Sequence, residues 1–210
     1  MIKEEIKEKL FSTKSSDRRK AAKEIGHLKL LDFSSDLLVA YIDEKKDKRT
    51  WETQVEMILA LGLVGYKPTL FEILPIIKQN KPHDMITYAV AQTYVRLTRH
   101  SLHDAQPVIE LLKFGGLSLV DGALKPLGDD KMMPPQEEIT KIIELSWNLH
   151  EHKDRIGNEN GYMDPRYGLI VACAGWDIQL TKDFLNHCLL TSGNDTSILK
   201  VVQNSIKGKF

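Results

Sequence analysis

The chain is poor in cysteine and aromatic residues, and it has no surplus of charge of either sign. Cys173 and Cys188 are the only cysteines among its 210 residues. They cannot build a disulfide framework and form no zinc-binding pattern. Aromatic residues make up 7%, and 29 Lys and Arg residues balance 29 Asp and Glu residues. A neutral chain of this kind has no overall field that attracts nucleic acid or an anionic membrane, and its cysteine content indicates a reducing compartment.

Long hydrophobic runs are also missing. The longest uncharged apolar stretch, residues 57–66, is about half as long as a membrane-spanning helix must be. Charged residues interrupt every apolar run within residues 1–10, which leaves no hydrophobic region typical of a signal peptide. We therefore expect a soluble, cytoplasmic protein that does not bind membranes.

Catalytic and metal-binding patterns are absent as well. No nucleophile lies near a base, no glycine-rich phosphate loop occurs, and no paired carboxylates surround a histidine at an interpretable spacing. His150 and His152 would face opposite ways on a helix, and no third ligand at a recognised spacing joins them. These absences favour a protein without catalytic residues, metal or cofactor.

An apolar period of 3.6 residues dominates the sequence, and the alternation typical of strands is hard to find. Ala21, Ala22, Ile25 and Leu28, for example, fall on one face of a helix. Start and stop signals divide the chain into about eleven short helices with short links. This pattern predicts an all-α fold of stacked helical hairpins rather than a four-helix bundle with long helices.

Small residues recur at a regular spacing within these helices. The pair Ile25-Gly26 returns as Leu61-Gly62 and Leu127-Gly128, with a weaker copy at 174–175. Gly62 follows Gly26 by 36 residues, and Gly128 follows Gly62 by 66, which is about two units of 33. The missing copy falls inside the helix that contains Thr93. Small side chains let neighbouring helices approach closely, so the spacing predicts a helical repeat.

Residues 17–44 carry a distinctive set of residues in their first helix, namely Asp17, Arg18, Ala21, Ala22, Ile25, Gly26 and Leu28. With these residues at these positions, the segment resembles a HEAT repeat. The resemblance continues in part over residues 50–80 and is only periodic afterwards. It implies one domain over residues 1–210, a short right-handed α-solenoid of about five antiparallel helix pairs whose second helices line a concave face. Residues 1–13 would form a possible N-terminal capping helix. The resemblance implies no reaction, because HEAT-like proteins are mostly protein-binding scaffolds, although some bind nucleic acid and a few are cofactor lyases.

Candidate contact residues gather around a long polar link between helices at residues 150–163. Links of this length are often functional, but this one also suits a solvated connector. Trp147 lies at the edge of the apolar stripe of the preceding helix. This position suits either an interface anchor or a side chain that covers the gap to the next repeat. The candidate partner-binding residues are Trp147, His150, His152, Asp154, Arg155, Glu159 and Tyr162.

These observations lead to two functional hypotheses. The first is a non-enzymatic protein–protein interaction module (an adaptor, assembly factor, or inhibitor of the immunity type) that binds through its concave face and edge loops. The second is a nucleic-acid-binding HEAT-like enzyme resembling an alkylbase DNA glycosylase, with Trp176 and Asp177 holding a cationic base. Residues 1–50 carry 13 Lys and Arg against 10 Asp and Glu. That surplus is small beside the roughly 6–10 phosphates that a duplex-binding groove neutralises, which favours the first hypothesis.

Overall fold

The structure, a computed structural model, describes residues 2–113, 115–155, 164–193 and 195–209. Over these ranges the chain forms twelve α-helices, five short 3-10 helices and no β-strand, which confirms the all-α prediction. The chain divides into two compact units. Unit 1 comprises Met1–Gln79 and Asp84–Leu97, and unit 2 comprises Asn80–His83 and Thr98–Phe210. The single domain expected over residues 1–210 stays a prediction.

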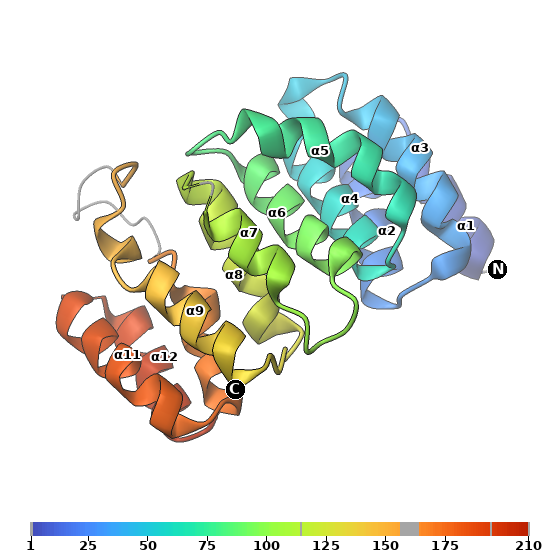
Figure 1. The fold of residues 1–210 in the computed structure, drawn as a ribbon. Helices are drawn as coiled ribbons and strands as arrows, with labels where there is room; N and C mark the ends of the chain where they lie inside the picture. The colour runs from blue at the N-terminus through green and yellow to red at the C-terminus, as the bar shows by residue number, and fades with distance from the viewer. Residues whose placement is uncertain (1, 114, 156–163, 194, 210) are drawn as a thin grey trace. The chain divides into compact units, whose positions relative to one another are not determined.

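Unit 1 contains two rows of helices, which Figure 1 shows from blue to green. One row holds α1, α3 and α5, and the other holds α2, α4 and α6. The helix α1 packs on α2 with Ile6 and Leu10 buried. The bounds are α1 (Ile2–Leu10), α2 (Ser15–His27), η1 (Leu31–Phe33), α3 (Ser34–Glu44), η2 (Lys48–Thr50), α4 (Trp51–Leu63), η3 (Lys67–Thr69), α5 (Leu70–Gln79) and α6 (Met85–Thr98), of which the last residue falls in unit 2.

Close contacts between α2, α4 and α6 depend on two of the glycines that the repeat spacing singled out. A Cβ atom on Gly26 would lie 3.0 Å from the Cα of Ala60, and one on Gly62 would lie 2.9 Å from Oγ1 of Thr93. The Thr93 hydroxyl donates a hydrogen bond of 2.8 Å to the carbonyl oxygen of Ile58. The predicted close approach of helices at these small residues is therefore confirmed.

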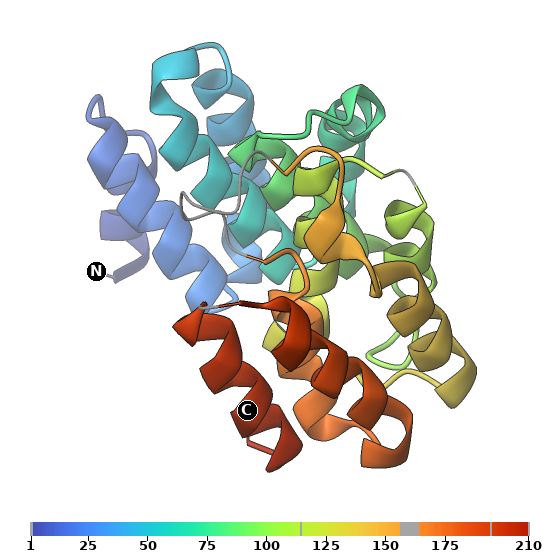
Figure 2. The same ribbon diagram turned by 90° about the vertical axis from the view of Figure 1, so that its left-hand side faces the viewer.

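Unit 2 also contains two rows of helices. Neighbours contact one another along α7, α9 and α11, and likewise along α8, α10 and α12. The views in Figures 1 and 2 show α11 and α12 side by side. The bounds are α7 (Gln106–Leu112), α8 (Leu117–Asp129), α9 (Gln136–Ser146), η4 (Leu149–Glu151), α10 (Tyr167–Ala172), η5 (Cys173–Gly175), α11 (Ile178–Thr191) and α12 (Thr196–Ile206).

Glycines also permit a close helix contact in unit 2, between α8 and α10. A Cβ atom on Gly168 would lie 2.6 Å from the carbonyl oxygen of Leu124, and one on Gly128 would lie 2.8 Å from Cγ1 of Val171. Gly128 belongs to the predicted spacing. Gly168, which permits the tighter of the two contacts, does not.

Both cysteines lie in the core of unit 2. Cys173 and Cys188 are buried. Burial raises the pKa of each thiol, that of Cys188 to about 12.

No helix in the described part of the chain is long and apolar enough to cross a membrane.

The contact between Gly62 and Thr93 gives a first prediction. Gly62→Ala places a methyl group against the backbone and hydroxyl of Thr93, so we expect a loss of about 1–3 kcal/mol in the free energy of unfolding. Urea denaturation followed by circular dichroism measures this loss. The control is Lys20→Ala on an exposed position of α2, which should leave stability nearly unchanged. Equal stability of Gly62→Ala and the wild type would show that α4 and α6 are not closely packed at this point.

Candidate partner-binding site

The predicted anchor Trp147 lies at the C-terminal end of α9. The stripe beside it is in the core, since Ile139, Ile142, Ile143 and Ser146 are all buried. The Trp147 side chain itself is half-buried. The structure thus confirms that Trp147 stands at the edge of the buried stripe.

Trp147 belongs to a cluster of aromatic rings that joins the end of α9 to α11. Its ring stacks on that of His187, with 4.6 Å between centroids and 18° between planes, and it also meets Phe184 at 6.0 Å. The His150 ring meets His187 edge-on at 5.2 Å. His187 Nε2 lies 3.2 Å from the carbonyl oxygen of Trp147. Because a carbonyl oxygen can only accept, this nitrogen is the donor. The His187 ring is therefore held by the Trp147 ring, the His150 ring and a hydrogen bond to the Trp147 backbone.

A fully buried ion pair lies next to this cluster. The Arg166 side chain is 0% exposed and that of Asp164 is 5% exposed. Nη2 of Arg166 donates to Oδ2 of Asp164 at 2.6 Å, and Nε donates to Oδ1 at 2.9 Å, which makes the pair bidentate. Two buried charges are tolerated only when they are paired and hydrogen-bonded, and this pair meets both conditions.

The remaining donors of Arg166 connect the ion pair to α9 and α11. Nη2 also donates to Oγ1 of Thr191 at 3.1 Å, and Nη1 reaches the carbonyl oxygen of Trp147 at 3.5 Å. The Thr191 hydroxyl donates in turn to the carbonyl oxygen of His187 at 2.8 Å. The arginine therefore ties together Trp147 and the residues that precede α10, which are the two flanks of the long inter-helix link.

The surroundings shift the pKa values of two groups in the cluster. Burial alone would raise the pKa of Asp164, but the hydrogen bonds and charge of Arg166 outweigh it and hold that pKa below its ordinary value. Burial, followed by the charge of Arg166, lowers the pKa of His150. At neutral pH the cluster therefore holds an ionised carboxylate, a guanidinium and a neutral His150.

A second acidic side chain of unit 2, Asp121 on α8, behaves in the opposite way. Burial raises its pKa to about 7, the charge of Asp164 adds to the rise, and Lys125 opposes it. The amino group of Lys125 is shared with other partners, since it lies 3.1 Å from Asp129 and 5.4 Å from the ring centroid of Tyr167. Asp121 is thus a carboxyl group that titrates near neutral pH.

The structure brings together some of the predicted partner-binding residues and places others in structural roles. Arg155 donates through Nη1 to the carbonyl oxygen of His150 at 2.7 Å. His152 accepts at Nδ1 from the backbone N–H of Asp154 at 3.2 Å. These contacts shape the start of the link, whereas Trp147 and His150 join the aromatic cluster. Glu159 and Tyr162 lie outside the described residues.

Sequence reasoning missed Arg166, His187 and Thr191. The sequence Asp164-Pro165 is typical of a helix start, in which the Asp side chain accepts from free backbone amides, and the Asp164 carboxylate does accept from the backbone N–H of Arg166 at 2.9 Å. The available signal was the charged Arg166 among apolar residues at the start of a buried helix. A further missed residue is Leu190, which follows His187 by about one helical turn on α11 and is 85% exposed.

The residues suggested for a base-binding site have structural roles instead. Trp176 is 6% exposed, and its Nε1 donates to the carbonyl oxygen of Met132 at 2.8 Å. Asp177 precedes α11 and accepts from the backbone N–H of Gln179 at 2.9 Å. The ring of Trp176 therefore offers no free face on which a base could stack.

The chemistry that this arrangement supports is binding. In the described ranges, no three His, Cys, Asp or Glu side chains are grouped so that they could hold a metal ion. The polar groups of the ion pair are buried and hydrogen-bonded to one another, whereas Trp147 is half-buried and Leu190 is exposed. We call the set of Trp147, the His187 that stacks on it, and Leu190, which lies three residues after His187 on α11, the Trp147 face.

Comparisons with known proteins give no match: no family model, no curated protein and no solved structure is significantly similar to the chain. The likeness to HEAT repeats therefore depends on the residues of the sequence itself.

The buried ion pair gives a second prediction. Asp164→Asn leaves the Arg166 charge buried without a counterion, and we expect it to lower the free energy of unfolding by about 3–5 kcal/mol. The double variant Asp164→Asn/Arg166→Met should recover part of this loss because it removes the uncompensated charge. Urea unfolding followed by tryptophan fluorescence measures the free energy of unfolding of both variants. The control is Arg49→Met, which breaks an exposed ion pair and should change stability little. If the double variant were no more stable than Asp164→Asn, the unpaired Arg166 charge would not be the cause of the loss.

Asp121 gives a third prediction, which concerns pH. Its folded-state pKa of about 7 exceeds the unfolded value of about 3.9. Its contribution to stability is therefore complete below about pH 4 and is lost as the pH rises to about 7. Asp121→Asn should flatten this part of the stability profile, measured as urea midpoints across the pH series. The exposed Glu137→Gln serves as control, and an unchanged profile in Asp121→Asn would refute the raised pKa.

Proposed function

We propose that the protein is a non-enzymatic protein-binding module, a HEAT-like α-solenoid that acts as an adaptor, assembly factor or inhibitor. The observation that carries this proposal is the Trp147 face. A half-buried tryptophan that stacks on His187, with an 85% exposed leucine three residues after His187 on α11, is the kind of rigid apolar anchor that dominates protein interfaces. The concave face and edge loops of the solenoid would provide the surrounding contacts.

The rigidity of Trp147 supports this use. Its ring lies against His187 and Phe184, and its carbonyl oxygen accepts hydrogen bonds from His187 and Arg166. A side chain that is already ordered loses little conformational entropy when a partner covers it. Leu190 contributes apolar area that the fold does not use, so its burial by a partner would add to affinity without a loss of internal packing.

The charges near the Trp147 face favour a protein partner over nucleic acid. Exposed lysines on α9, on α11 and in the following link are matched or outnumbered by exposed carboxylates, and a surface of this composition does not attract a phosphate backbone. The lysines are Lys141, Lys153 and Lys182, and the carboxylates are Glu137, Glu144, Glu151 and Asp183.

The glycosylase-like alternative gains no support from the site. Its candidate residues Trp176 and Asp177 are engaged in core packing and helix capping. A duplex containing an alkylated base tests it directly, because an enzyme of that kind would release the base, whereas a protein-binding module would leave the duplex intact.

Leu190→Glu provides the fourth prediction. A photo-crosslinking amino acid at position 190 should capture a protein that resists nuclease treatment, and the purified partner can then be titrated. We expect Leu190→Glu to weaken that complex at least about tenfold, since loss of a central apolar anchor costs ~2 kcal/mol or more. Stability should change little because the side chain is exposed.

The matched control is Leu28→Glu, which alters an exposed leucine of unit 1 and should leave the affinity unchanged. The proposal fails if both variants bind equally well, or if the chain binds only nucleic acid.

A further inference from the structure

Helix α5 of unit 1 carries apolar side chains on the face that points away from the core. Phe71 is 83% exposed and Leu74 is 40% exposed, and Pro75 is exposed as well. These residues lie at the i, i+3 and i+4 spacing of neighbours on one side of a helix. Ile73 and Ile77 occupy the opposite side and are buried. The fold therefore uses only one of the two apolar faces of α5.

The exposed face is a patch rather than a single apolar residue. A phenylalanine that is 83% exposed adds little to the packing of its own unit. Single exposed apolar residues are common on protein surfaces, but adjoining ones mark interaction sites. We call the surface formed by Phe71, Leu74 and Pro75 the α5 face.

Pro75 also affects hydrogen bonding on this side of the helix. Proline has no N–H, so the helix bond that residue 75 would donate to the carbonyl oxygen of Phe71 cannot form. A proline inside a helix is costly compared with alanine, and the exposed ring of Pro75 gains little burial in return. The Phe71 carbonyl oxygen is thus an acceptor that a donor on a partner chain can use.

Two lysines stand at the ends of the α5 face. Lys67 precedes α5, and Lys78 lies in the last turn, on the same side as Phe71. Both side chains are exposed, and neither forms an ion pair within the described ranges of the chain. Their charges are therefore available to a partner.

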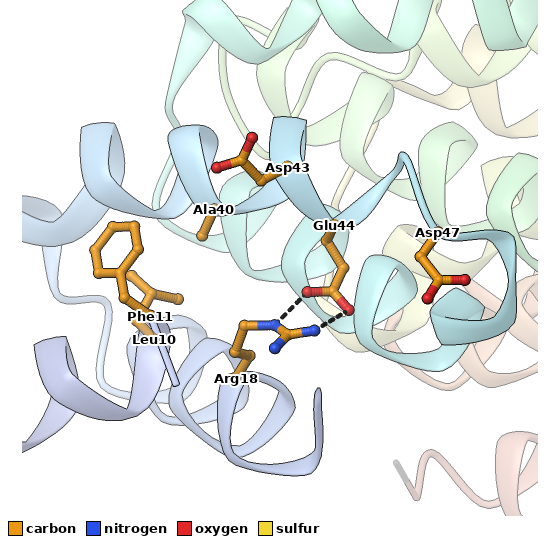
Figure 3. A pocket seen from close by; sticks show the side chains of 7 residues that line it. All are labelled: Leu10, Phe11, Arg18, Ala40, Asp43, Glu44 and Asp47. Carbon is orange, nitrogen blue, oxygen red and sulfur yellow. Dashed lines mark hydrogen bonds and ion pairs between the residues drawn. The ribbon is translucent and has the colours of Figure 1, made fainter. Parts of the chain in front are cut away.

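Nearby carboxylates are committed to other cations. Lys45, which follows α3, pairs with Glu72, and this pair links the end of α3 to α5. The other carboxylates at this end of α3 are also paired, namely Glu44 with Arg18 (Figure 3), Asp43 with Lys46 and Asp47 with Arg49. The α5 face is thus bordered by positive charge that the unit itself does not neutralise.

We infer that the α5 face binds an acidic amphipathic helix of a partner protein. Its apolar side chains would cover Phe71, Leu74 and Pro75, and carboxylates near its two ends would meet Lys67 and Lys78. Helix α5 contains 10 residues, which is about 15 Å, so a partner helix of about four turns can reach both lysines. The α5 face lies entirely in unit 1 and is separate from the Trp147 face.

An anionic membrane suits this surface less well than a protein does. Membrane-binding basic segments usually carry about four to eight Lys and Arg residues, whereas Lys67 and Lys78 are only two. Lipid acyl chains also offer no donor to the carbonyl oxygen of Phe71. The charge pattern and the free acceptor thus both favour a polypeptide.

The fifth prediction concerns the peptides that bind the full chain. The probe is a phage-displayed library of random peptides about 15 residues long, enough for four helical turns, with counter-selection against Phe71→Glu/Leu74→Glu. The enriched peptides should be amphipathic and should contain more Asp and Glu than Lys and Arg. Fluorescence anisotropy should show at least about tenfold weaker binding of each peptide to Phe71→Glu/Leu74→Glu, because this variant loses the apolar anchor. Its urea midpoint should change little, since both positions are exposed.

The charge contribution is tested separately. Lys67→Gln/Lys78→Gln should weaken the selected peptides about fivefold, as expected for the loss of two exposed ionic contacts, and should reduce the effect of added salt on affinity. The matched controls are Lys20→Gln/Lys23→Gln on α2 and Leu31→Glu on η1. They change exposed lysines and an exposed leucine of the same unit and should leave affinity unchanged.

Several outcomes would overturn the proposal. It is wrong if no peptide is enriched, if the enriched peptides are neutral or basic, or if their affinity is the same for Lys67→Gln/Lys78→Gln as for the wild type. Binding to phosphatidylserine vesicles that Phe71→Glu/Leu74→Glu abolishes would assign the face to a membrane instead. Self-association in sedimentation velocity that the same variant abolishes would assign it to a second copy of the chain.

Discussion

Close approach between helices is the constraint on which each unit depends. A helix that carries glycine or alanine at its crossing point can place its backbone against the next helix, and any larger side chain would separate them. Gly62 against Thr93 in unit 1 and Gly168 against Leu124 in unit 2 are the clearest cases. Such contacts hold the rows of helices together and leave the outer faces of α3, α5 and α11 free to carry exposed side chains.

The buried pair of Asp164 and Arg166 serves a different purpose in unit 2. Asp164 and Arg166, which precede α10, are both buried, so their charges need partners inside the protein. Arg166 supplies donors to Asp164, Thr191 and Trp147 at once. One side chain thereby fixes the end of α9 relative to α11, and the position of the Trp147 ring follows from that arrangement.

The sequence was sufficient to predict what depends on local periodicity. The all-α class, the buried stripe around Ile142, the edge position of Trp147 and the close contacts at Gly26 and Gly62 all follow from residue spacing. The pairing of Arg166 with Thr191 and the stacking of His187 on Trp147 join residues 25 and 40 positions apart in the sequence. No regular spacing marks such contacts.

The burial of both native thiols has a practical consequence for work on this protein. Cys173 and Cys188 are enclosed and their pKa values are raised, so neither presents a thiolate to a reagent near neutral pH. A cysteine introduced on the surface would be the fast-reacting group without removal of the natural pair. Spin labels, fluorophores or cross-linkers can therefore be attached one position at a time to the otherwise unaltered chain.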